Sequence, residues 1–210
     1  MATVRPGTLI LDWDNTLHDA AGAFFRALRT VMEGRGTPLD AATYRAAYDP
    51  DYRVLYARLG VPADEVDALS VQWRRLVRAA EPRLIPGAGP ALERIRAAGV
   101  PCAIVTAAPR GQVERQLAAT GLAWLPAVVC GGEAAPRPDP APLRRAVERI
   151  EAPTEPIVYV GDTAADMQMA VAAGVRGVGV AGFSSTEATL RAAGAVETAP
   201  SFAAWASRWL

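Results

Sequence analysis

The sequence predicts an α/β protein with a parallel sheet core flanked by helices and an inserted all-helical cap. From residue 90 onward, apolar runs of strand length alternate with helical patterns, which is typical of a parallel sheet covered by helices. Before residue 82, one short apolar run is followed only by helical patterns. A cluster of proline and glycine at 82–90 separates the two regions, so we expect a core and an insert.

The chain opens with a predicted strand, the apolar run Leu9, Ile10 and Leu11. An apolar run of this length is consistent with a buried strand. Two carboxylates, Asp12 and Asp14, follow it directly. Open α/β sheets place ligands at the carboxyl ends of their strands, so this pair is a candidate site. Turns also favour Asp and Asn, and for this stretch alone a surface turn is an equally good interpretation.

The next region is predicted to be entirely helical. The helical patterns cover 20–35, 41–48, 52–59 and 63–80. No strand pattern interrupts them, and an all-helical block after one strand does not fit a simple strand–helix–strand crossover. We therefore predict an inserted helical cap over 18–83 and a core formed by 1–17 together with 84–210.

The remaining elements alternate regularly. The predicted strands lie at 101–106, 127–130, 157–160 and 177–180, and the predicted helices lie at 90–98, 110–120, 141–150, 164–173 and 185–193. A last segment, 202–209, is predicted as a helix that carries Trp205 and Trp209 four residues apart. That spacing is typical of a stripe that faces the core.

The charge and hydrophobicity of the chain favour small-molecule chemistry. The 210 residues include 22 basic and 22 acidic side chains, which gives a formal net charge of zero without long single-sign blocks. This balance does not suggest a nucleic-acid surface. No apolar stretch approaches the roughly 20 residues that cross a bilayer, and the N-terminus lacks a signal-peptide pattern. We therefore expect a cytoplasmic protein without membrane contact.

Two candidate anion-binding groups follow later strands. Thr106 and the adjacent backbone N–H groups precede a helix, where they are suited to bind an anion. Arg137 lies in a proline-stiffened loop, 135–140, that can direct its charge. In isolation, each residue has a simpler interpretation: Thr106 as a local helix cap and Arg137 as a solvated loop arginine.

A second acid pair follows the strand predicted at 157–160. Asp162 comes just after that strand, and Asp166 comes one helical turn later. Carboxylate oxygens suit Mg²⁺, which takes one or two carboxylates and keeps several waters. A turn in which Asp162 or Thr163 caps the following helix explains the same residues. Because a parallel sheet brings its strand ends to one edge, we expect all these groups to share one site.

Taken together, these motifs resemble those of the haloacid dehalogenase superfamily. Residues 12–17 resemble its first motif, Thr106 its second, 137–140 its third and 161–166 its fourth. The helical insert and the stretch 174–195 are similar to the phosphoglycolate-phosphatase-like branch. The resemblance covers nearly the whole chain. It implies a Rossmann-like core in which the first- and fourth-motif strands are neighbours.

The resemblance also implies a Mg²⁺-dependent phosphatase whose substrate is a small phosphate monoester, phosphoglycolate-like or a sugar phosphate. Asp12 would attack phosphorus to form an aspartyl-phosphate, and Asp14 would protonate the leaving oxygen and then activate water. The implied catalytic residues are Asp12, Asp14, Thr106 and Arg137. The residues implied to bind the substrate phosphate are Trp13, Thr106, Ala107 and Arg137.

The implied metal site uses the two acid pairs. Asp12, Asp162 and the backbone carbonyl of Asp14 would bind Mg²⁺, and Asp166 would steady the site or its waters. Phosphoryl transfer depends mainly on positioning and charge neutralisation, so an anionic nucleophile needs cations and hydrogen-bond donors around the phosphate. The implied roles agree with this requirement.

The chain departs from the family pattern at Arg137, where the family usually has lysine. Arginine keeps the charge but is longer and planar. The chain contains no lysine at all, so the substitution is compatible with a composition bias. A second departure is Ala107, where relatives often carry a polar side chain; a contact through the backbone survives that change.

Three other functions stay open on the sequence alone. A phosphomutase would use the same core residues. A 2-haloacid dehalogenase would use the same aspartate against carbon, but halide leaves without a proton, so Asp14 as an acid/base group argues against it. A non-catalytic phosphate-binding protein is compatible with the Arg137 departure.

His18, at the predicted core–cap hinge, either touches substrate or is an exposed or hydrogen-bonded hinge residue. Neither the ester nor the oligomeric state is predicted.

Overall fold

The computed structural model describes residues 5–49 and 51–210. The chain divides into two compact units. The segment up to Asp19 and the segment from Pro82 onward form one unit, here called the core unit, and Ala20–Glu81 forms the other, here called the helical unit. The helical unit differs from the predicted insert, 18–83, by two residues at each end.

Backbone hydrogen bonds explain why the connecting residues belong to the core unit. The N–H of Asp19 donates to the carbonyl of Arg83 at 2.9 Å, and the N–H of Ile85 donates to the carbonyl of Leu17 at 2.7 Å. The two connecting segments, one leading into the helical unit and one leading out of it, are therefore hydrogen-bonded to each other within the core unit.

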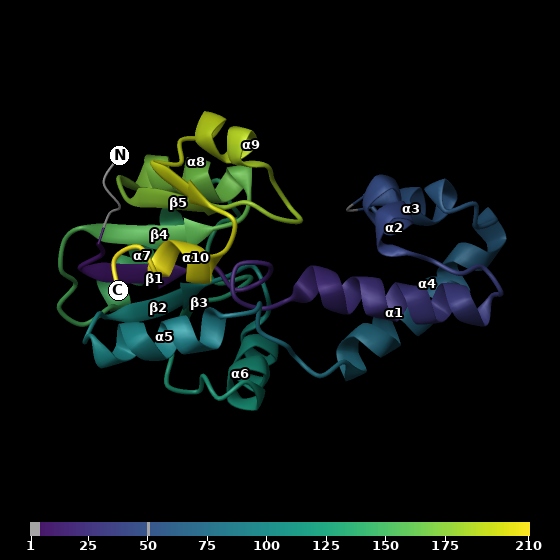
Figure 1. The fold of residues 1–210 in the computed structure, drawn as a ribbon, viewed down its shortest axis with the longest axis horizontal. Helices are drawn as coiled ribbons and strands as arrows, with labels where there is room; N and C mark the ends of the chain where they lie inside the picture. The colour runs from purple at the N-terminus through teal and green to yellow at the C-terminus, as the bar shows by residue number, and fades with distance from the viewer. Residues whose placement is uncertain (1–4, 50) are drawn as a thin grey trace. The chain divides into compact units, whose positions relative to one another are not determined.

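The core unit is built on one six-stranded sheet within the described residues (Figure 1). Its strands are β1 (Thr8–Leu11), β2 (Cys102–Val105), β3 (Ala127–Val129), β4 (Ile157–Gly161), β5 (Arg176–Val180) and β6 (Glu197–Ala199). Its helices are α5 (Ala88–Ala97), α6 (Arg110–Ala119), α7 (Ala141–Arg149), α8 (Ala164–Ala173), α9 (Glu187–Ala192) and α10 (Phe202–Ala206). Every pairing between these strands is parallel, so the predicted Rossmann-like α/β class is confirmed.

The strand order is β3-β2-β1-β4-β5-β6, which puts β1 inside the sheet between β2 and β4. In register, Leu11 lies opposite Ile104 on β2 and Val160 on β4. The strands that carry the first and fourth motifs are therefore neighbours, as predicted. Because all the strands are parallel, the segments that follow β1, β2 and β4 meet at one edge of the sheet.

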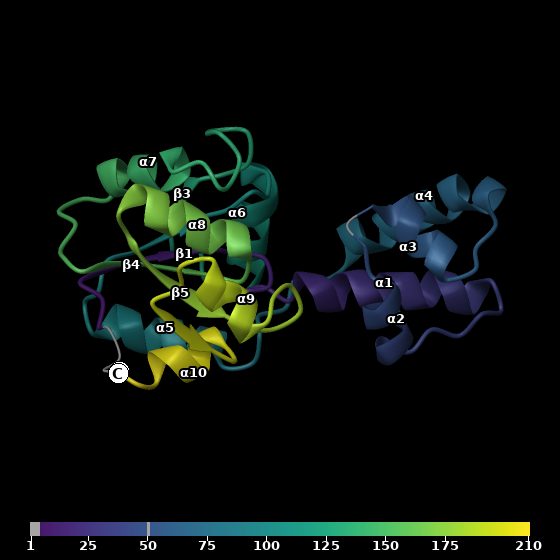
Figure 2. The ribbon, with the colours of Figure 1, turned by 90° about the horizontal axis from the view of Figure 1, so that it is seen from above.

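Helices cover both faces of this sheet. Leu9 and Leu11 pack into one hydrophobic cluster with α5 and α10, whereas Ile10 packs into another with α7 and α8. Figure 2 shows α7 and α8 on one side of the sheet and α5 and α10 on the other. Burial on both faces explains why the strands read as continuous apolar runs in the sequence.

The helical unit has a small hydrophobic core of its own. It contains α1 (Ala20–Gly34), α2 (Ala41–Ala47), α3 (Tyr52–Arg58) and α4 (Ala63–Ala79). On α1, Leu28, Val31 and Met32 are buried on one face. The Trp73 indole N–H on α4 donates to the carbonyl of Phe24 on α1 at 3.1 Å, and the two rings meet edge to face. These contacts hold α4 against α1.

The structure corrects two expectations at the C-terminal end. Sequence analysis missed β6, which pairs with β5 and places Thr198 opposite Gly179. The strand is only three residues long and begins with Glu197, so it lacks the apolar run that marks the others. The last helix, α10, ends at Ala206 rather than 209, so Trp205 is a buried core residue while Trp209 packs against the core from the turn that follows.

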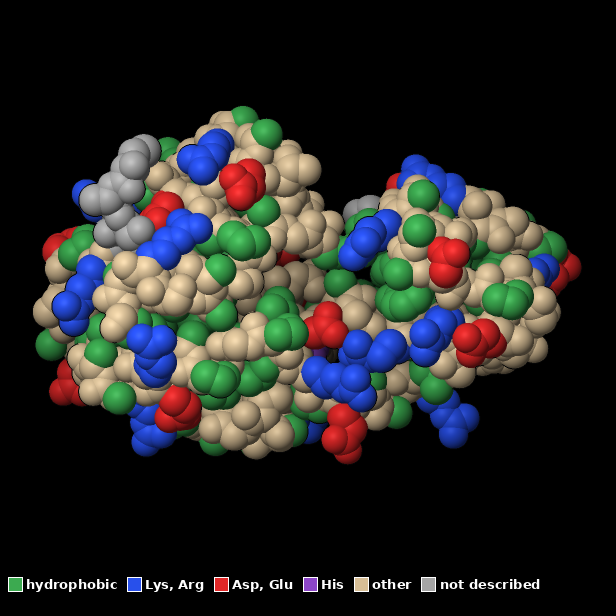
Figure 3. Space-filling model, viewed as in Figure 1, with side chains coloured by type: hydrophobic (Ala, Val, Ile, Leu, Met, Phe, Trp, Pro, Cys, Tyr) green, Lys and Arg blue, Asp and Glu red, His purple; other side chains and the backbone are tan. Residues whose placement is uncertain are grey.

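The surface agrees with the balanced composition. On the face of the core unit seen in Figure 3, acidic and basic side chains are interspersed rather than separated into two single-sign areas. None of the helices in the described part of the chain is long and apolar enough to cross a membrane.

Candidate active site

The end of β1 delivers the first site residue. The N–H of Asp12 donates to the carbonyl of Val160 at 2.9 Å, so Asp12 still belongs to the edge of the sheet. The chain then turns through Asn15, whose φ of 62° lies in the left-handed region that Asn tolerates. This turn lets Thr16 reach back, and its hydroxyl donates to Asp12 Oδ2 at 3.1 Å. Asp12 is 2% exposed.

The end of β4 leads to Asp162 and to Asp166 on the first turn of α8. Asp166 Oδ2 accepts hydrogen bonds from the N–H and the hydroxyl of Thr163, and the Thr163 hydroxyl accepts from the Asp166 N–H, which forms a capping box. Tyr159 on β4 donates its hydroxyl to Asp166 Oδ1 at 2.8 Å. Gly161 permits this close approach, since a Cβ there would lie 2.7 Å from the Asp166 Cβ. Asp166 is therefore fixed by both β4 and α8.

Asp12, Asp162 and Asp166 form a buried acidic group. One carboxylate oxygen from each residue lies within 4.8 Å of the other two. Arg137 faces this group: its Nη2 lies 2.5 Å from Asp12 Oδ1 and its Nη1 lies 2.8 Å from Asp166 Oδ1. Nη2 also donates to the carbonyl of Val105, at the end of β2. One guanidinium thus bridges two of the three carboxylates.

Burial, and to a smaller extent the neighbouring carboxylates, changes the pKa values in this group. Burial raises the pKa of Asp12 well above its usual range, and the Arg137 guanidinium opposes that shift. Burial, together with the Asp166 carboxylate, raises the pKa of Asp162 to about 7. Burial also raises the pKa of Tyr159, which keeps its hydroxyl protonated as a donor to Asp166. Additional positive charge here would favour the ionised carboxylates.

The donor set of the acidic group fits a divalent cation. Asp162 Oδ2 is buried and accepts no hydrogen bond within the residues that the structure describes. Buried acceptors are normally paired, and carboxylate oxygens are preferred ligands of Mg²⁺. Asp12 and Asp166 differ, because both oxygens of each residue already accept hydrogen bonds or an ion pair. Asp162 therefore offers the open ligand oxygen, and Asp12 and Asp166 place further carboxylate oxygens within 4.8 Å of it.

The turn after β2 contributes Thr106 and Ala107. The Thr106 hydroxyl oxygen accepts a hydrogen bond from the N–H of Ala108 at 3.1 Å, so Thr106 closes a local turn before α6 and is not the helix cap of the simpler interpretation, since the N-cap of α6 is Pro109. Because that bond uses the oxygen, the hydroxyl hydrogen can still be donated to a ligand. Thr106, Ala107 and Arg137 line one cavity of about 280 Å³. The structure therefore brings together three of the four residues predicted to bind phosphate.

The remaining predicted residues, Trp13 and Asp14, lie differently. The Trp13 side chain is fully buried and donates to Gln116 at 2.8 Å, so only its backbone is left for the predicted phosphate contact. The Asp14 carboxylate is partly exposed and lies 2.9 Å from Nδ1 of His18. His18 is itself buried and stacks on the Trp13 ring, with 5.6 Å between ring centroids. His18 is therefore a hydrogen-bonded residue and not an exposed one, and its contact with substrate stays a prediction.

Sequence reasoning missed the role of Tyr159. Its hydroxyl is the buried donor that holds Asp166, but in the sequence it reads as one more large residue of an apolar strand. Its position gives a usable signal, because Tyr159 alternates with Val158 and Val160 and so points to the opposite face of the sheet from them. A tyrosine in a buried strand normally requires a partner for its hydroxyl.

Comparisons with known proteins agree with this geometry. Residues 9–180 match the model of the haloacid dehalogenase-like hydrolase family. A phosphoglycolate phosphatase from Rhodospirillum rubrum is 32% identical over 187 residues, which cover 81% of this chain and 77% of the relative. A plasmid-borne phosphoglycolate phosphatase from Cupriavidus necator is 34% identical over 189 residues, which cover 83% of this chain and 81% of the relative.

A solved structure shares the fold of this chain. The crystal structure of CbbY from Rhodobacter sphaeroides, in complex with phosphate, aligns with a TM-score of 0.63 at 22% identity, covering 95% of this chain and 96% of that one. The match to the family model spans most of the chain and includes Asp12, Thr106, Arg137 and Asp162. The chain therefore belongs to the haloacid dehalogenase-like hydrolase family.

Proposed function

We propose that this hydrolase is a Mg²⁺-dependent phosphatase that acts on a small phosphate monoester through an aspartyl-phosphate on Asp12. The observation that carries the proposal is the buried acidic group of Asp12, Asp162 and Asp166 facing Arg137 at the carboxyl edge of the sheet. Relatives named phosphoglycolate phosphatase support 2-phosphoglycolate or a similar small ester as the substrate.

In the first step, a carboxylate oxygen of Asp12 attacks phosphorus. A phosphorus–oxygen bond to Asp12 forms, the bond to the ester oxygen breaks, and Asp14 gives its proton to that leaving oxygen. Arg137 supports this step because its charge lies beside both the nucleophile and the incoming phosphate. The Thr106 hydroxyl and the N–H groups of its turn would bind phosphate oxygens.

In the second step, the aspartyl-phosphate is hydrolysed. Asp14, now ionised, takes a proton from water, the water oxygen attacks phosphorus, and the bond to Asp12 breaks to release inorganic phosphate. His18 supports this role, since its contact to Asp14 and its stacking on Trp13 hold the Asp14 carboxylate in one orientation. Asp14 therefore acts as acid and then as base from one fixed position.

The metal would be held by the carboxylates of Asp12 and Asp162 and by the backbone carbonyl of Asp14. When bound, Mg²⁺ supplies positive charge that stabilises the phosphate oxygens and the ionised carboxylates. The unpaired Asp162 Oδ2 supports this assignment. Asp166 would hold Arg137 in place and would not itself bind the metal.

We assign to the helical unit, Ala20–Glu81, the role of a cap. A cap that excludes bulk water protects an aspartyl-phosphate from uncontrolled hydrolysis and selects the ester that is accepted. The core residues alone do not distinguish one phosphate monoester from another, so selectivity would come from this unit.

A phosphate-release screen tests the proposed function. We expect the protein to hydrolyse small phosphate monoesters in the presence of Mg²⁺, to lose activity with EDTA, and to show little activity on a folded phosphoprotein. Asp162→Ala should raise the Mg²⁺ concentration needed for half-maximal activity, because it removes a direct ligand. Full activity after exhaustive EDTA treatment would contradict the proposal. Isomerised sugar phosphate would indicate a mutase instead, and chloride released from a 2-chloroacid would indicate a dehalogenase.

The raised pKa of Asp162 predicts how stability depends on pH and metal. Its folded pKa, about 7, lies above the usual 3.8, because burial disfavours the ionised carboxylate, so the metal-free fold loses stability as pH rises from about 3.8 through about 7. Added Mg²⁺ should therefore raise the melting temperature more at about pH 8 than at about pH 5, since protons compete with the metal. Thermal melts of wild type and Asp162→Asn check this, and an equal Mg²⁺ effect at both pH values would refute it.

A further inference from the structure

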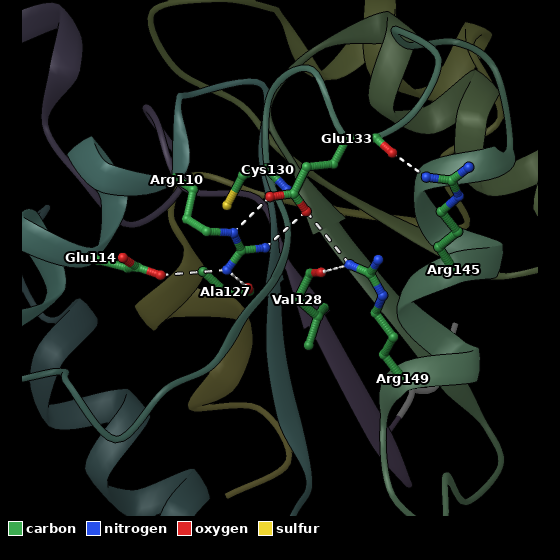
Figure 4. Close-up of polar contacts among 8 residues, drawn as sticks. All are labelled: Arg110, Glu114, Ala127, Val128, Cys130, Glu133, Arg145 and Arg149. Carbon is green, nitrogen blue, oxygen red and sulfur yellow. Dashed lines mark hydrogen bonds and ion pairs between the residues drawn. The ribbon is translucent and has the colours of Figure 1, made fainter.

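A polar network beside the site is centred on Glu133, in the loop between β3 and α7 (Figure 4). Arg110, the first residue of α6, donates through Nε and Nη2 to the two Glu133 carboxylate oxygens at 2.6 and 2.8 Å. Arg110 Nη1 donates to the carbonyl of Ala127 on β3 at 2.8 Å. The two-point geometry of this ion pair fixes the direction of the Glu133 side chain as well as its distance.

The same carboxylate is held from the other side of the loop. The N–H of Cys130 donates to Glu133 Oε2 at 3.3 Å, and Arg149 Nη1 lies 3.5 Å from the same oxygen. Arg149 also donates to the carbonyl of Val128, and Arg145 donates to the carbonyl of Glu133. Glu133 therefore joins α6, the end of β3 and α7 at one point.

The loop also packs directly on the turn that carries Thr106. The N–H of Gly131 donates to the carbonyl of Ala108 at 2.9 Å. A Cβ at Gly131 would lie 2.1 Å from the carbonyl oxygen of Ala107, so the backbones of the loop and the turn are in close contact. Any movement of the loop at 130–133 would therefore displace the Thr106–Ala108 turn.

Arg137 lies four residues after Glu133 in the same loop. Its guanidinium contacts Asp12 and the carbonyl of Val105 through Nη2 and contacts Asp166 through Nη1. The Glu133 network and the Arg137 contacts thus fix the two ends of one short segment. A side chain that must meet two carboxylates at once has little tolerance for movement of its backbone.

We propose that Glu133 is a positioning residue for the phosphate site, which it serves by holding the Arg137 loop and the Thr106 turn in register with Asp12. The proposal rests on the proposed function, because it assigns Arg137 and Thr106 to phosphate binding. Glu133 does not touch the acidic group itself. The hydrogen bond from the Arg110 guanidinium has the largest effect on the Glu133 carboxyl and lowers its pKa to about 2. The carboxylate therefore keeps its charge throughout the neutral range.

The test compares Glu133→Gln with the matched control Glu114→Gln. Glu114 also pairs with Arg110, at 3.5 Å, but it is exposed on α6, and within the described residues it makes no hydrogen bond or ion pair with the loop. We expect Glu133→Gln to weaken binding of inorganic phosphate, measured by calorimetry with Mg²⁺, by about 10- to 100-fold, as for a misplaced binding group. Glu114→Gln should stay within about twofold of wild type, because an exposed pair contributes little. Wild-type affinity in a folded Glu133→Gln variant would overturn the proposal.

Two further measurements separate positioning from general stability. Arg110→Gln removes the same ion pair from its other partner and should reproduce the loss, which covers the case in which Glu133→Gln does not fold. Because Glu133 acts partly through Arg137, the Glu133→Gln change should reduce phosphate affinity by a smaller factor in an Arg137→Lys background than in the wild type. Fully multiplicative losses would show instead that Glu133 does not act through Arg137. Calorimetry does not require turnover, so a wild type that binds phosphate but hydrolyses no ester would sink the proposed function without affecting this test.

Discussion

Replacing Asp12 with asparagine is expected to abolish phosphate release while leaving the fold intact. An amide is a poor nucleophile, and the substitution also removes a charge from the acidic group. The shapes of the two side chains match, so the amide oxygen of the introduced asparagine can still accept from Thr16 or Arg137. We expect kcat/KM to fall by about three orders of magnitude or more, as for other nucleophile replacements. Steady-state kinetics on the best ester measures this.

Two controls make this experiment decisive. Asp67→Asn changes an exposed carboxylate in the helical unit and should leave turnover unchanged. Acid-quenched wild-type enzyme, incubated with a labelled ester and digested, should carry the label on the peptide that contains Asp12. Retention of a tenth of wild-type activity by purified, folded Asp12→Asn would remove Asp12 from the role of nucleophile.

Replacing Arg137 with alanine is expected to have the second-largest effect. The guanidinium bridges Asp12 and Asp166, so its loss leaves buried carboxylates with less neutralising charge and removes a donor to phosphate. We expect a loss of about 2–4 kcal/mol of transition-state stabilisation, or roughly 30- to 1,000-fold in kcat/KM. Arg137→Lys should retain more activity than Arg137→Ala, because lysine keeps the positive charge. Lysine cannot, however, bridge both carboxylates with a planar fork.

The matched control for this prediction is Arg144→Ala. Arg144 lies on α7, and its guanidinium donates to the backbone carbonyl of Ala172 at an exposed position. Arg110 cannot take over from Arg137 in this structure, because its guanidinium is bound to Glu133. Wild-type kcat/KM in Arg137→Ala would therefore show that the phosphate needs no side-chain cation. If Arg137→Lys were more active than the wild type, the natural arginine would impair the site.

The sequence was sufficient for the parts of the site that lie at strand ends. Asp12 and Asp162 follow apolar runs, and a parallel sheet must bring such positions to one edge. The pairing of Arg137 with Asp12 could not be predicted from local pattern, because the two residues are 125 positions apart in the sequence. Their contact depends on the order of the strands in the sheet as well as on which segments form strands. The adjacency of β1 and β4 came from the family resemblance rather than from the pattern.

Features that depend on side-chain register were harder to predict. Tyr159 lies in an apolar strand, and only the neighbouring helix α8 gives its hydroxyl an acceptor. His18 reads as a hinge residue, yet the turn after β1 buries it against Trp13. The Arg110–Glu133 pair joins residues 23 positions apart across a loop, and no helical or strand period connects them. Long-range polar contacts of this kind carry no local sequence signal.

Because of the capping box at α8, the positions of the Asp166 and Arg137 charges depend on whether the first turn of this helix is formed. Asp166 uses one oxygen to cap the first turn of α8 and the other to receive Tyr159 and Arg137. If that turn frays, Asp166 keeps only the Tyr159 and Arg137 contacts of one oxygen, so the carboxylate that orients Arg137 is held less firmly. Amide hydrogen exchange at Asp166 and Met167 would therefore report, in solution and without any substrate, the fraction of molecules in which the site is assembled.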